Sequence, residues 1–550
     1  MKRIGLVLGL LSCAVGSAAF AWRMWDWALN FDPGFTFSTV PVPTGSPSSA
    51  GVTILLVDGL RLDASRRMQT LNALRLEGAD IEAQVGTPSF SRPGRATVAV
   101  GAYPAIHGVT SNRQKREIPL DNIIRRVGAM GGTCRIAGSK IWSSLFGKDI
   151  ERCGVYRAGE AKEGPGAFVR QVPDVRASQE AGIAFILQEP AMLRIADIIS
   201  TDFAAHEYGG TSPEYLSEVQ RTDVLLGELV RTLDLTKETL IVTSDHGHRD
   251  AGGHGGEEAE VLSIPIVMVG AGIKPGAVAK ASQADIAPTV AALLGAALPA
   301  ASSGRPLESV LALEESGRVS LNAAAAAQRA AFERAVGERL GVTADPRGRT
   351  DWASLVIAHR DADKKGRIPY FILAALLIPA LTFAAVRVSK ASDLGLLAGL
   401  AAVVLGLLGP IGARIPTMSF SAINYDEMLV PFFVRILTLV AVGTLTGALV
   451  AAGVGQVFRR RPTLDTAFER AGSMGLVLAA ALSVMTAAWW WSFDLLSPVT
   501  LPGSDALVQA YSLTLATFSA SVTTIVLMMA LRIIEGAGRS RGAAADSASS

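Results

Sequence analysis

The residues best suited to chemistry follow apolar runs that predict β-strands. Asp245 and His246 follow one such run, Leu-Ile-Val at 240–242, after two residues. The same arrangement occurs twice earlier, where apolar runs lead into Asp58 and toward Asp202 and His206. Because α/β proteins hold their ligands at the carboxyl ends of parallel strands, we expect these carboxylates and imidazoles to meet at one edge of a sheet.

These side chains form a set of nitrogen and oxygen ligands. The set comprises Asp58, Asp202, His206, Asp245, His246 and His254. It is too large for one tetrahedral zinc but suits two metals that share a site. A nucleophile is available in segment 87–94, where a serine hydroxyl lies in a turn bounded by Pro and Gly. No His-Asp dyad spacing surrounds it, so coordination to a metal is the natural way to activate it.

Five motifs in this order resemble the alkaline phosphatase superfamily: 58–63, 88–94, 202–206, 244–247 and 253–256. Asp-Gly-Leu-Arg-X-Asp and Ser-Arg-Pro-Gly make the chain most similar to the GPI ethanolamine phosphate transferases. The next most similar branch is the type I phosphodiesterase (nucleotide pyrophosphatase) branch. This similarity depends on Tyr103-Pro104 and on the segment from His107-Gly108 to Asn112. The resemblance covers roughly residues 50–300 and implies a mostly parallel sheet flanked by helices.

The resemblance also implies roles for individual residues. One metal would be held by Asp202, His206 and His254, and a second by Asp58, Asp245, His246 and the Ser91 oxygen. Two divalent ions are expected, with zinc favoured by the histidines and manganese as the other choice. Ser91 would be the nucleophile, and Asn112 would contact the phosphoryl group. Residues 110–113 differ from the Thr-Lys-Gly-Trp expected of the eukaryotic transferases, which leaves the acceptor open.

Other polar residues allow two readings each. Lys140, at the end of a predicted strand, either reaches a phosphate or is solvated. His248 either reaches substrate or lies in a loop, whereas His107 is expected to be structural. Cys134 and Cys153 either pair, as an oxidising compartment would allow, or remain buried thiols.

The second half of the chain has the composition of a membrane domain. The 550 residues are 49% hydrophobic with a formal net charge of +2, and no dense basic tract predicts a nucleic-acid partner. Apolar runs predict five spanning helices at 369–386, 394–411, 428–458, 472–491 and 506–534. Arg435 lies inside the third, so it either holds a lipid phosphate in the outer leaflet or snorkels to the interface.

Basic residues on alternate loops predict the orientation. They gather at 387–390, 459–461 and 532–541, which the positive-inside rule places in the cytoplasm. Segment 1–30 is either a first spanning helix or a cleaved signal peptide, and both export the following domain. We therefore expect an integral protein of the cell (inner) membrane with an extracytoplasmic catalytic domain and a cytoplasmic C-terminus.

The predicted architecture is an α/β domain followed by an all-α membrane bundle. Its parts are an anchor at 1–30, a linker at 31–50, a catalytic domain at 51–315, a helical and polar connector along the membrane surface at 316–368, the five-helix domain at 369–535 and a disordered cytoplasmic tail at 536–550.

Five membrane helices favour lipid handling, because a hydrolase of soluble esters needs at most one anchor. The sequence predicts a transferase that moves a phosphoethanolamine-type headgroup from a phospholipid donor to a glycan, lipid or protein acceptor through a phospho-Ser91 intermediate. One alternative is a membrane-anchored phosphodiesterase or pyrophosphatase that passes the phosphoryl group to water. Another is a transporter or scaffold with an inactive domain, against which the complete ligand set argues.

Overall fold

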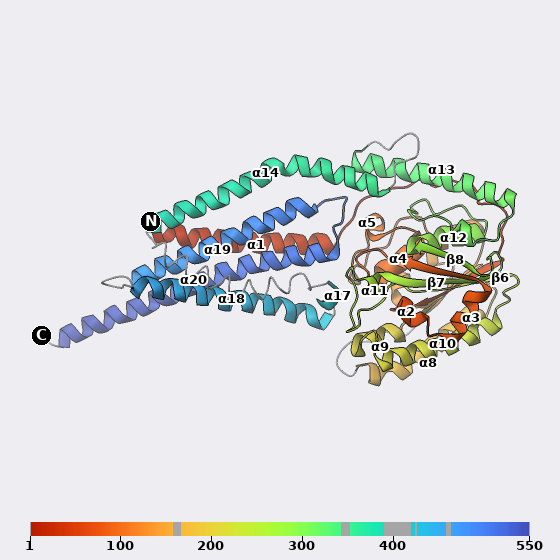
Figure 1. The fold of residues 1–550 in the computed structure, drawn as a ribbon, viewed down its shortest axis with the longest axis horizontal. Helices are drawn as coiled ribbons and strands as arrows, with labels where there is room; N and C mark the ends of the chain where they lie inside the picture. The colour runs from red at the N-terminus through yellow and green to blue at the C-terminus, as the bar shows by residue number, and fades with distance from the viewer. Residues whose placement is uncertain are drawn as a thin grey trace.

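An α/β domain and a bundle of long helices make up the molecule, and the bundle extends from one side of the domain (Figure 1). The computed structural model describes residues 2–157, 167–342, 352–389, 420–423, 426–457 and 464–548. Within these ranges, four helices contain spans long and apolar enough to cross a membrane: Ile4–Leu29 in α1 (Lys2–Leu29), Phe433–Val450 in α18 (Asp426–Val457), Ala467–Phe493 in α19 (Leu464–Phe493) and Ser504–Ala537 in α20 (Ser504–Ala548). The chain is an integral membrane protein.

The α/β domain is built on an eight-stranded sheet with the order β4-β3-β5-β1-β6-β7-β2-β8. The strands are β1 (Gly51–Val57), β2 (Ala79–Gln84), β3 (Cys134–Gly138), β4 (Gly154–Arg157), β5 (Leu193–Ile198), β6 (Glu238–Thr243), β7 (Ser263–Gly270) and β8 (Ala277–Ser282). Neighbouring strands are parallel except at β7, which runs antiparallel to both β6 and β2. The predicted mostly parallel α/β fold is confirmed.

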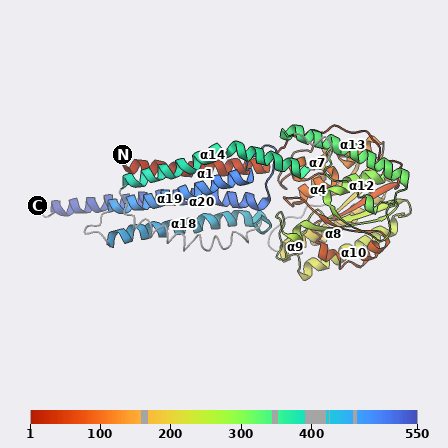
Figure 2. The same cartoon turned by 45° about the horizontal axis from the view of Figure 1, so that its top comes forward.

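Helices cover both faces of this sheet (Figure 2). Successive side chains of a strand point to opposite faces, so Val52, Ile54 and Leu56 of β1 enter one hydrophobic core while Leu55 and Val57 enter the other. The first core is closed by α4 (Ser91–Val100), α6 (Ile123–Ala129), α7 (Lys140–Ile150), α12 (Ile286–Leu293) and α13 (Glu315–Leu340), and the second by α3 (Gln69–Glu77), α8 (Ala167–Leu187), α9 (Ser200–Tyr208) and α10 (Pro213–Thr232).

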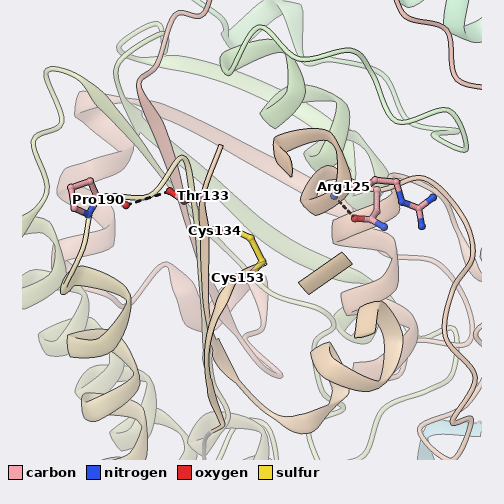
Figure 3. The surroundings of a disulfide bond; sticks show 6 residues. Arg125, Thr133, Cys134, Cys153 and Pro190 are labelled. Carbon is pink, nitrogen blue, oxygen red and sulfur yellow. Dashed lines mark hydrogen bonds between the residues drawn. A yellow bond between two sulfur atoms is a disulfide. The ribbon is translucent and has the colours of Figure 1, made fainter. Parts of the chain in front are cut away.

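A disulfide resolves the open question about the two domain cysteines. Cys134, the first residue of β3, is bonded to Cys153, which precedes β4 (Figure 3). The bond closes a segment with a sequence separation of 19 residues. Restricting the unfolded chain over a loop of that length stabilises a domain by roughly 3 kcal/mol.

Two segments predicted as connectors belong to the domain instead. In the linker, Phe37 stacks on Phe332 of α13 with ring centroids 5.2 Å apart, and the Thr44 hydroxyl donates to the Ala296 carbonyl. In α13, Phe332 and Val336 are buried in the first core. The expectation that this helix lies along a membrane surface is therefore wrong, because its aromatic and aliphatic side chains cover the sheet.

The described bundle largely follows the predicted spans. Helix α14 (Trp352–Ser389) includes 369–386, and α18, α19 and α20 include the third to fifth predicted spans, while 394–411 lies outside the described residues. Helix α20 continues to Ala548 where a disordered tail is predicted, and its alanine run 543–545 favours helix. Both termini lie at the end of the bundle away from the domain (Figure 1).

Candidate metal and nucleophile site

Three neighbouring strands bring the predicted ligands together. In the sheet, β1 lies between β5 and β6 and is parallel to both. Asp58 directly follows β1 and Asp245 follows β6 after one residue, while Asp202 and His206 lie one turn apart on α9, which follows β5. Side chains separated by more than 140 residues in sequence therefore meet at one sheet edge, as the strand-end pattern predicts.

The first part of the site, here called the carboxylate half, consists of Asp58 and Asp245 around Arg95. The Arg95 guanidinium donates to Asp58 Oδ2 at 2.8 Å and to Asp245 Oδ2 at 2.7 Å. Its Nε donates to Asp197 Oδ2 at 3.0 Å. All four side chains are buried. Burial opposes the arginine charge, but the three carboxylates hold the Arg95 pKa above its ordinary value.

The pKa values of the two carboxyl groups in the carboxylate half shift in opposite directions. Burial raises the pKa of Asp245, and the neighbouring Asp58 carboxylate raises it further. Burial also acts on Asp58, but the charges of Arg95 and His246 outweigh it and lower its pKa. One arginine facing three buried carboxylates leaves an excess of negative charge, which is the field that a metal cation requires.

The second part, here called the imidazole half, gathers His206, His248 and His254 around Asp202. Asp202 Oδ1 lies 2.6 Å from His248 Nε2 and 3.6 Å from His254 Nε2, and the Nε2 atoms of His206 and His254 are 3.0 Å apart. His246 joins the two halves, since its ring stacks on His254 with centroids 3.7 Å apart. Burial lowers the pKa of His246 to about 4 and those of His248 and His254 well below their ordinary value.

The orientation of the histidines fits metal binding. His254 Nδ1 lies 3.0 Å from the Ser89 carbonyl and His246 Nδ1 lies 3.1 Å from the Gly247 carbonyl. A carbonyl only accepts, so each Nδ1 carries the proton and each Nε2 presents a lone pair. His246 Nε2 then faces Asp58 Oδ1 at 3.4 Å, and that oxygen makes no hydrogen bond among the described residues.

Two acceptors that face each other in a buried site repel unless a cation lies between them. The residues present therefore fit a metal, and the mixture of imidazoles and carboxylates suits zinc or manganese. Asp58, Asp245 and His246 are grouped closely enough to hold one ion, and Asp202, His246, His248 and His254 form a second such group.

Ser91 lies between the ligands and a helix N-terminus. Its Oγ is 3.2 Å from His246 Nε2. Helix α4 begins at Ser91 itself, and Pro93 is tolerated because it lies in the first helical turn. The first amides of a helix attract anions, so a phosphoryl group on this hydroxyl would lie where the helix dipole stabilises it.

Asn112 adjoins the nucleophile through the backbone. Its Oδ1 accepts the Arg92 amide N–H at 2.8 Å, and Arg92 is the residue after Ser91. The Asn112 side-chain oxygen is thus committed, which leaves the amide nitrogen to donate to a phosphoryl oxygen. Asn112 is exposed, so incoming substrate can reach it.

Glycine is required where the ligand segments approach each other. Gly59 has φ of +70°, and a Cβ there would lie 2.8 Å from His248 Cδ2 and 3.0 Å from the Asp202 Cα. At Gly94 in α4, a Cβ would lie 2.7 Å from Asp245 Cβ. The glycines of the Asp-Gly and Ser-Arg-Pro-Gly motifs thus let β1 and α4 pack against the ligand loops.

The remaining sequence-predicted residues have different surroundings. His248 lies in the loop after β6 and is fully buried there, beside Asp202. Lys140 opens α7 with an exposed side chain, and Arg435 is exposed on α18. His107 is buried beside Thr97, and burial lowers its pKa to about 3, as suits a structural residue.

Arg95 and Asp197 are the functional residues that sequence reasoning missed. Arg95 follows Ser91 by one helical turn, and its guanidinium also donates to the Ser91 carbonyl at 3.2 Å. Asp197 is a charged residue inside the apolar strand β5. A charge in a buried strand and an arginine one turn after a nucleophile were the available signals.

The site thus contains a serine at a helix N-terminus and two sets of metal-type ligands, at the edge of a mostly parallel sheet. This is the arrangement expected of the alkaline phosphatase superfamily. Comparison with known proteins confirms this resemblance. Residues 52–120 and 170–262 match the family model described as type I phosphodiesterase / nucleotide pyrophosphatase.

Relatives with curated names are GPI ethanolamine phosphate transferases. GPI ethanolamine phosphate transferase 1 of Mus musculus is 24% identical over 321 residues, which cover 49% of this chain and 34% of the relative. GPI ethanolamine phosphate transferase 2, catalytic subunit, of Homo sapiens is 25% identical over 289 residues, which cover 49% of this chain and 28% of the relative. The matched part thus spans about a third of these relatives.

Among solved structures, murine ectonucleotide pyrophosphatase / phosphodiesterase 5 is 15% identical with a TM-score of 0.40, and the match covers 48% of this chain and 100% of that one. The sequence relatives are transferases and the family model describes phosphodiesterases, so the domain is similar to enzymes that cleave or transfer phosphate esters.

Proposed function

We propose that the chain is a two-metal phosphotransferase that moves a phosphoethanolamine-type headgroup from a membrane phospholipid to an extracytoplasmic glycan, lipid or protein acceptor. The observation that carries this proposal concerns Phe90, the residue before Ser91. Its ring meets His254 edge-on at 5.9 Å and meets Phe420 of α17 (Phe420–Ile423) at 5.4 Å. The nucleophile segment and the ligand set therefore contact α17, a short helix that packs against the membrane helices α18 and α20.

Hydrogen bonds reinforce this junction. The Ser421 hydroxyl of α17 accepts from the Gly256 amide at 2.7 Å and donates to Glu258, both in the segment that follows His254. The Ser504 hydroxyl at the start of α20 donates to the Gly255 carbonyl at 3.0 Å. An enzyme of soluble esters has no need of such bonds, whereas a lipid substrate must be delivered from the membrane to the ligands.

In the proposed reaction, Ser91 Oγ attacks the headgroup phosphorus, and the bond from phosphorus to the diacylglycerol oxygen breaks. The acceptor hydroxyl then displaces Ser91, and the proton that it loses balances the one gained by diacylglycerol. Bound metals would supply charge stabilisation for the attacking and leaving oxygens. The α4 N-terminus and the Asn112 amide would orient the phosphoryl oxygens, and Arg95 would hold Asp58 and Asp245 in place.

The proposed topology follows from the arrangement of the helices. Both termini lie at the end of the bundle opposite the catalytic domain (Figure 1), and the basic loops predict that this end is cytoplasmic. A reporter fused after Ser550 should then be cytoplasmic, whereas one inserted near Ser48 should be exported. The inverse pattern would overturn the proposed location of the catalytic domain.

The transferase proposal is tested by following a labelled headgroup. The purified chain is incubated with vesicles that contain headgroup-labelled phosphatidylethanolamine, with and without acceptor alcohols. Acid quenching should trap label on the peptide that contains Ser91, and added acceptor should release it as an acceptor ester. The exposed Ser309 provides a matched control: Ser309→Ala should be labelled like the wild type and Ser91→Ala should not.

The phosphodiesterase alternative keeps support from the family model. It predicts that label leaves the enzyme only as a water-soluble phosphate ester, whatever acceptor is added. Label transferred to the acceptor in proportion to its concentration would reject this alternative, and its absence with every class of acceptor alcohol would reject the transferase.

A further inference from the structure

An apolar cavity of about 110 Å³ lies between the catalytic domain and the bundle. From the domain it is lined by Phe90, Ser111 and Arg113, which adjoin Ser91 and Asn112 in sequence, and from the bundle by Trp25, Phe433 and Tyr511. Thr110, also in the lining, donates its hydroxyl to the Ala28 carbonyl of α1 at 2.6 Å. The cavity therefore begins beside the reacting groups.

A larger groove of about 450 Å³ continues from this cavity into the bundle. Trp25, Arg113, Phe433 and Tyr511 line both spaces, so the two adjoin and are together called the passage here. The Phe433 and Tyr511 rings pack with centroids 4.8 Å apart, and Trp25 lies 5.9 Å from Tyr511. Three aromatic rings, those of Trp25, Phe433 and Tyr511, thus line the passage where its two parts adjoin.

The dimensions of the passage match one leaflet. On α1 its lining runs from Leu29 back to Ser17, on the order of 18 Å at 1.5 Å per residue. On α20 the lining residues Leu507, Tyr511 and Leu515 follow one helical face. Half of a hydrocarbon core is about 15 Å thick, so the passage is long enough for one extended acyl chain.

The passage contains a charged side chain. Among the described residues that line it, Arg113 is the only one with a charged side chain, and it lines both spaces where they adjoin, next to Asn112 in sequence. The membrane end is formed by Ser17, Ala18 and Phe518. An apolar groove with a guanidinium between its membrane part and the catalytic domain complements a molecule with a hydrocarbon tail and an anionic phosphate head.

We propose that this passage, hereafter the chain passage, holds one acyl chain of the donor glycerophospholipid and that Arg113 binds the donor phosphate. The proposal rests on the proposed function. The donor is the better occupant than a lipid acceptor because its phosphodiester must lie at Ser91 in the first step, and the chain passage reaches Phe90, the residue before Ser91. Arg435, which could hold a lipid phosphate or snorkel to the interface, does not line it.

Two neighbouring alanines on α1 give a matched test. Ala18 and Ala19 are both exposed, but only Ala18 lines the chain passage. In Ala18→Phe the added ring occupies the space of several methylenes, so the ratio of kcat/KM on long-chain phosphatidylethanolamine to kcat/KM on a soluble p-nitrophenyl phosphodiester should fall about tenfold. In Ala19→Phe this ratio should stay at the wild-type value. Equal ratios in the two variants would overturn the proposal.

The proposed role of Arg113 as the phosphate ligand is tested by removing its positive charge. Arg113→Gln should raise KM for phosphatidylethanolamine about tenfold or more, because a charged hydrogen bond to a phosphate is lost, and Arg113→Lys should recover part of the loss. An unchanged KM in Arg113→Gln would remove Arg113 as the phosphate ligand.

Cross-linking locates the chain directly. The full chain is placed in phosphatidylcholine vesicles with a phosphatidylethanolamine that carries a diazirine in the middle of one acyl chain. Cross-links should fall on peptides that contain Trp25, Phe433 or Tyr511, and should weaken in Ala18→Phe but not in Ala19→Phe. Cross-links on the outer helix faces alone, or equal labelling by a diacylglycerol probe without phosphate, would overturn the proposal.

The same probe separates the two levels of inference. Ser91→Ala should cross-link like the wild type, because binding precedes chemistry. If Ser91→Ala cross-links but the wild type transfers no label, the chain passage stands and the proposed transferase fails. If label is transferred and no passage residue cross-links, the transferase stands and the chain passage fails.

Discussion

In the carboxylate half of the site, Asp58 and Asp245 face the buried guanidinium of Arg95, whereas in the imidazole half three histidines face one another and the single carboxylate of Asp202. The first half contains one cation of its own, Arg95, for three carboxylates. In the second half, the Nε2 atoms of His206 and His254 approach within 3.0 Å, and no arginine or lysine belongs to this half as defined above. We infer that Arg95 organises the first half and that a metal, when bound, would organise the second.

The largest expected effect concerns Ser91, whose Oγ lies 3.2 Å from His246 Nε2. Ser91→Ala should lower turnover by at least about a thousandfold, because the proposed covalent intermediate forms on this hydroxyl. Both halves should keep their shape, since the hydroxyl is one small group among many ligands. Turnover and metal content of the purified variant check this, and full activity would remove Ser91 as nucleophile.

Removing the cation of the carboxylate half should cost stability. Arg95→Met leaves three buried carboxylates without their partner, and breaking a buried ion pair from one side costs about 3–5 kcal/mol. Thermal and denaturant unfolding of the metal-free protein in detergent measure the loss. The partly exposed Arg66, which pairs with Asp80, is the control, and Arg66→Met should cost about 1 kcal/mol or less. Equal losses would mean that Arg95 does not organise its half.

Removing one histidine of the imidazole half should lower the metal content of that half alone. The wild type should carry about two zinc or manganese ions per chain. His254→Ala should lose most of one ion and keep the other, because the carboxylate half retains Asp58, Asp245 and His246. Elemental analysis after gel filtration provides the count. Loss of both ions together would show that the halves are not independent, and full activity of metal-free protein would reject the two-metal site.

The smallest expected effect is the pH dependence contributed by His107, which lies outside both halves. Its Nδ1 accepts the Val109 amide at 3.0 Å, so the folded protein requires the neutral ring. Burial lowers its pKa to about 3 from an unfolded value of about 6.5. Below about pH 6.5 the unfolded chain binds the extra proton, so the stability present above that pH is lost as pH falls toward 3.

His107→Gln should therefore be less stable at neutral pH but should lose less stability between pH 6.5 and 4 than the wild type does. Thermal midpoints measured across this interval test the sign. Parallel curves for the two proteins would mean that the ionisation of the site histidines alone sets the acid sensitivity.

The sequence by itself determined the sheet and the gathering of the ligands, because both depend on local patterns. Apolar runs of strand length predicted β1, β5 and β6, and parallel strands end at the same edge, so Asp58, Asp202 and Asp245 had to approach one another. The four described spans likewise follow from apolar length alone.

The tertiary structure alone decided which groups face which. Sequence spacing shows that Arg95 lies one turn after Ser91, but only packing selects Asp58, Asp197 and Asp245 as its partners. In the same way, the sequence left open whether His248 reaches substrate or is only a loop residue. The structure shows that this loop histidine is fully buried beside Asp202 of α9. Burial and long-range partners depend on how distant elements meet, which no local periodicity encodes. For the same reason, the chain passage became visible only once α1, α18 and α20 were placed against the nucleophile segment.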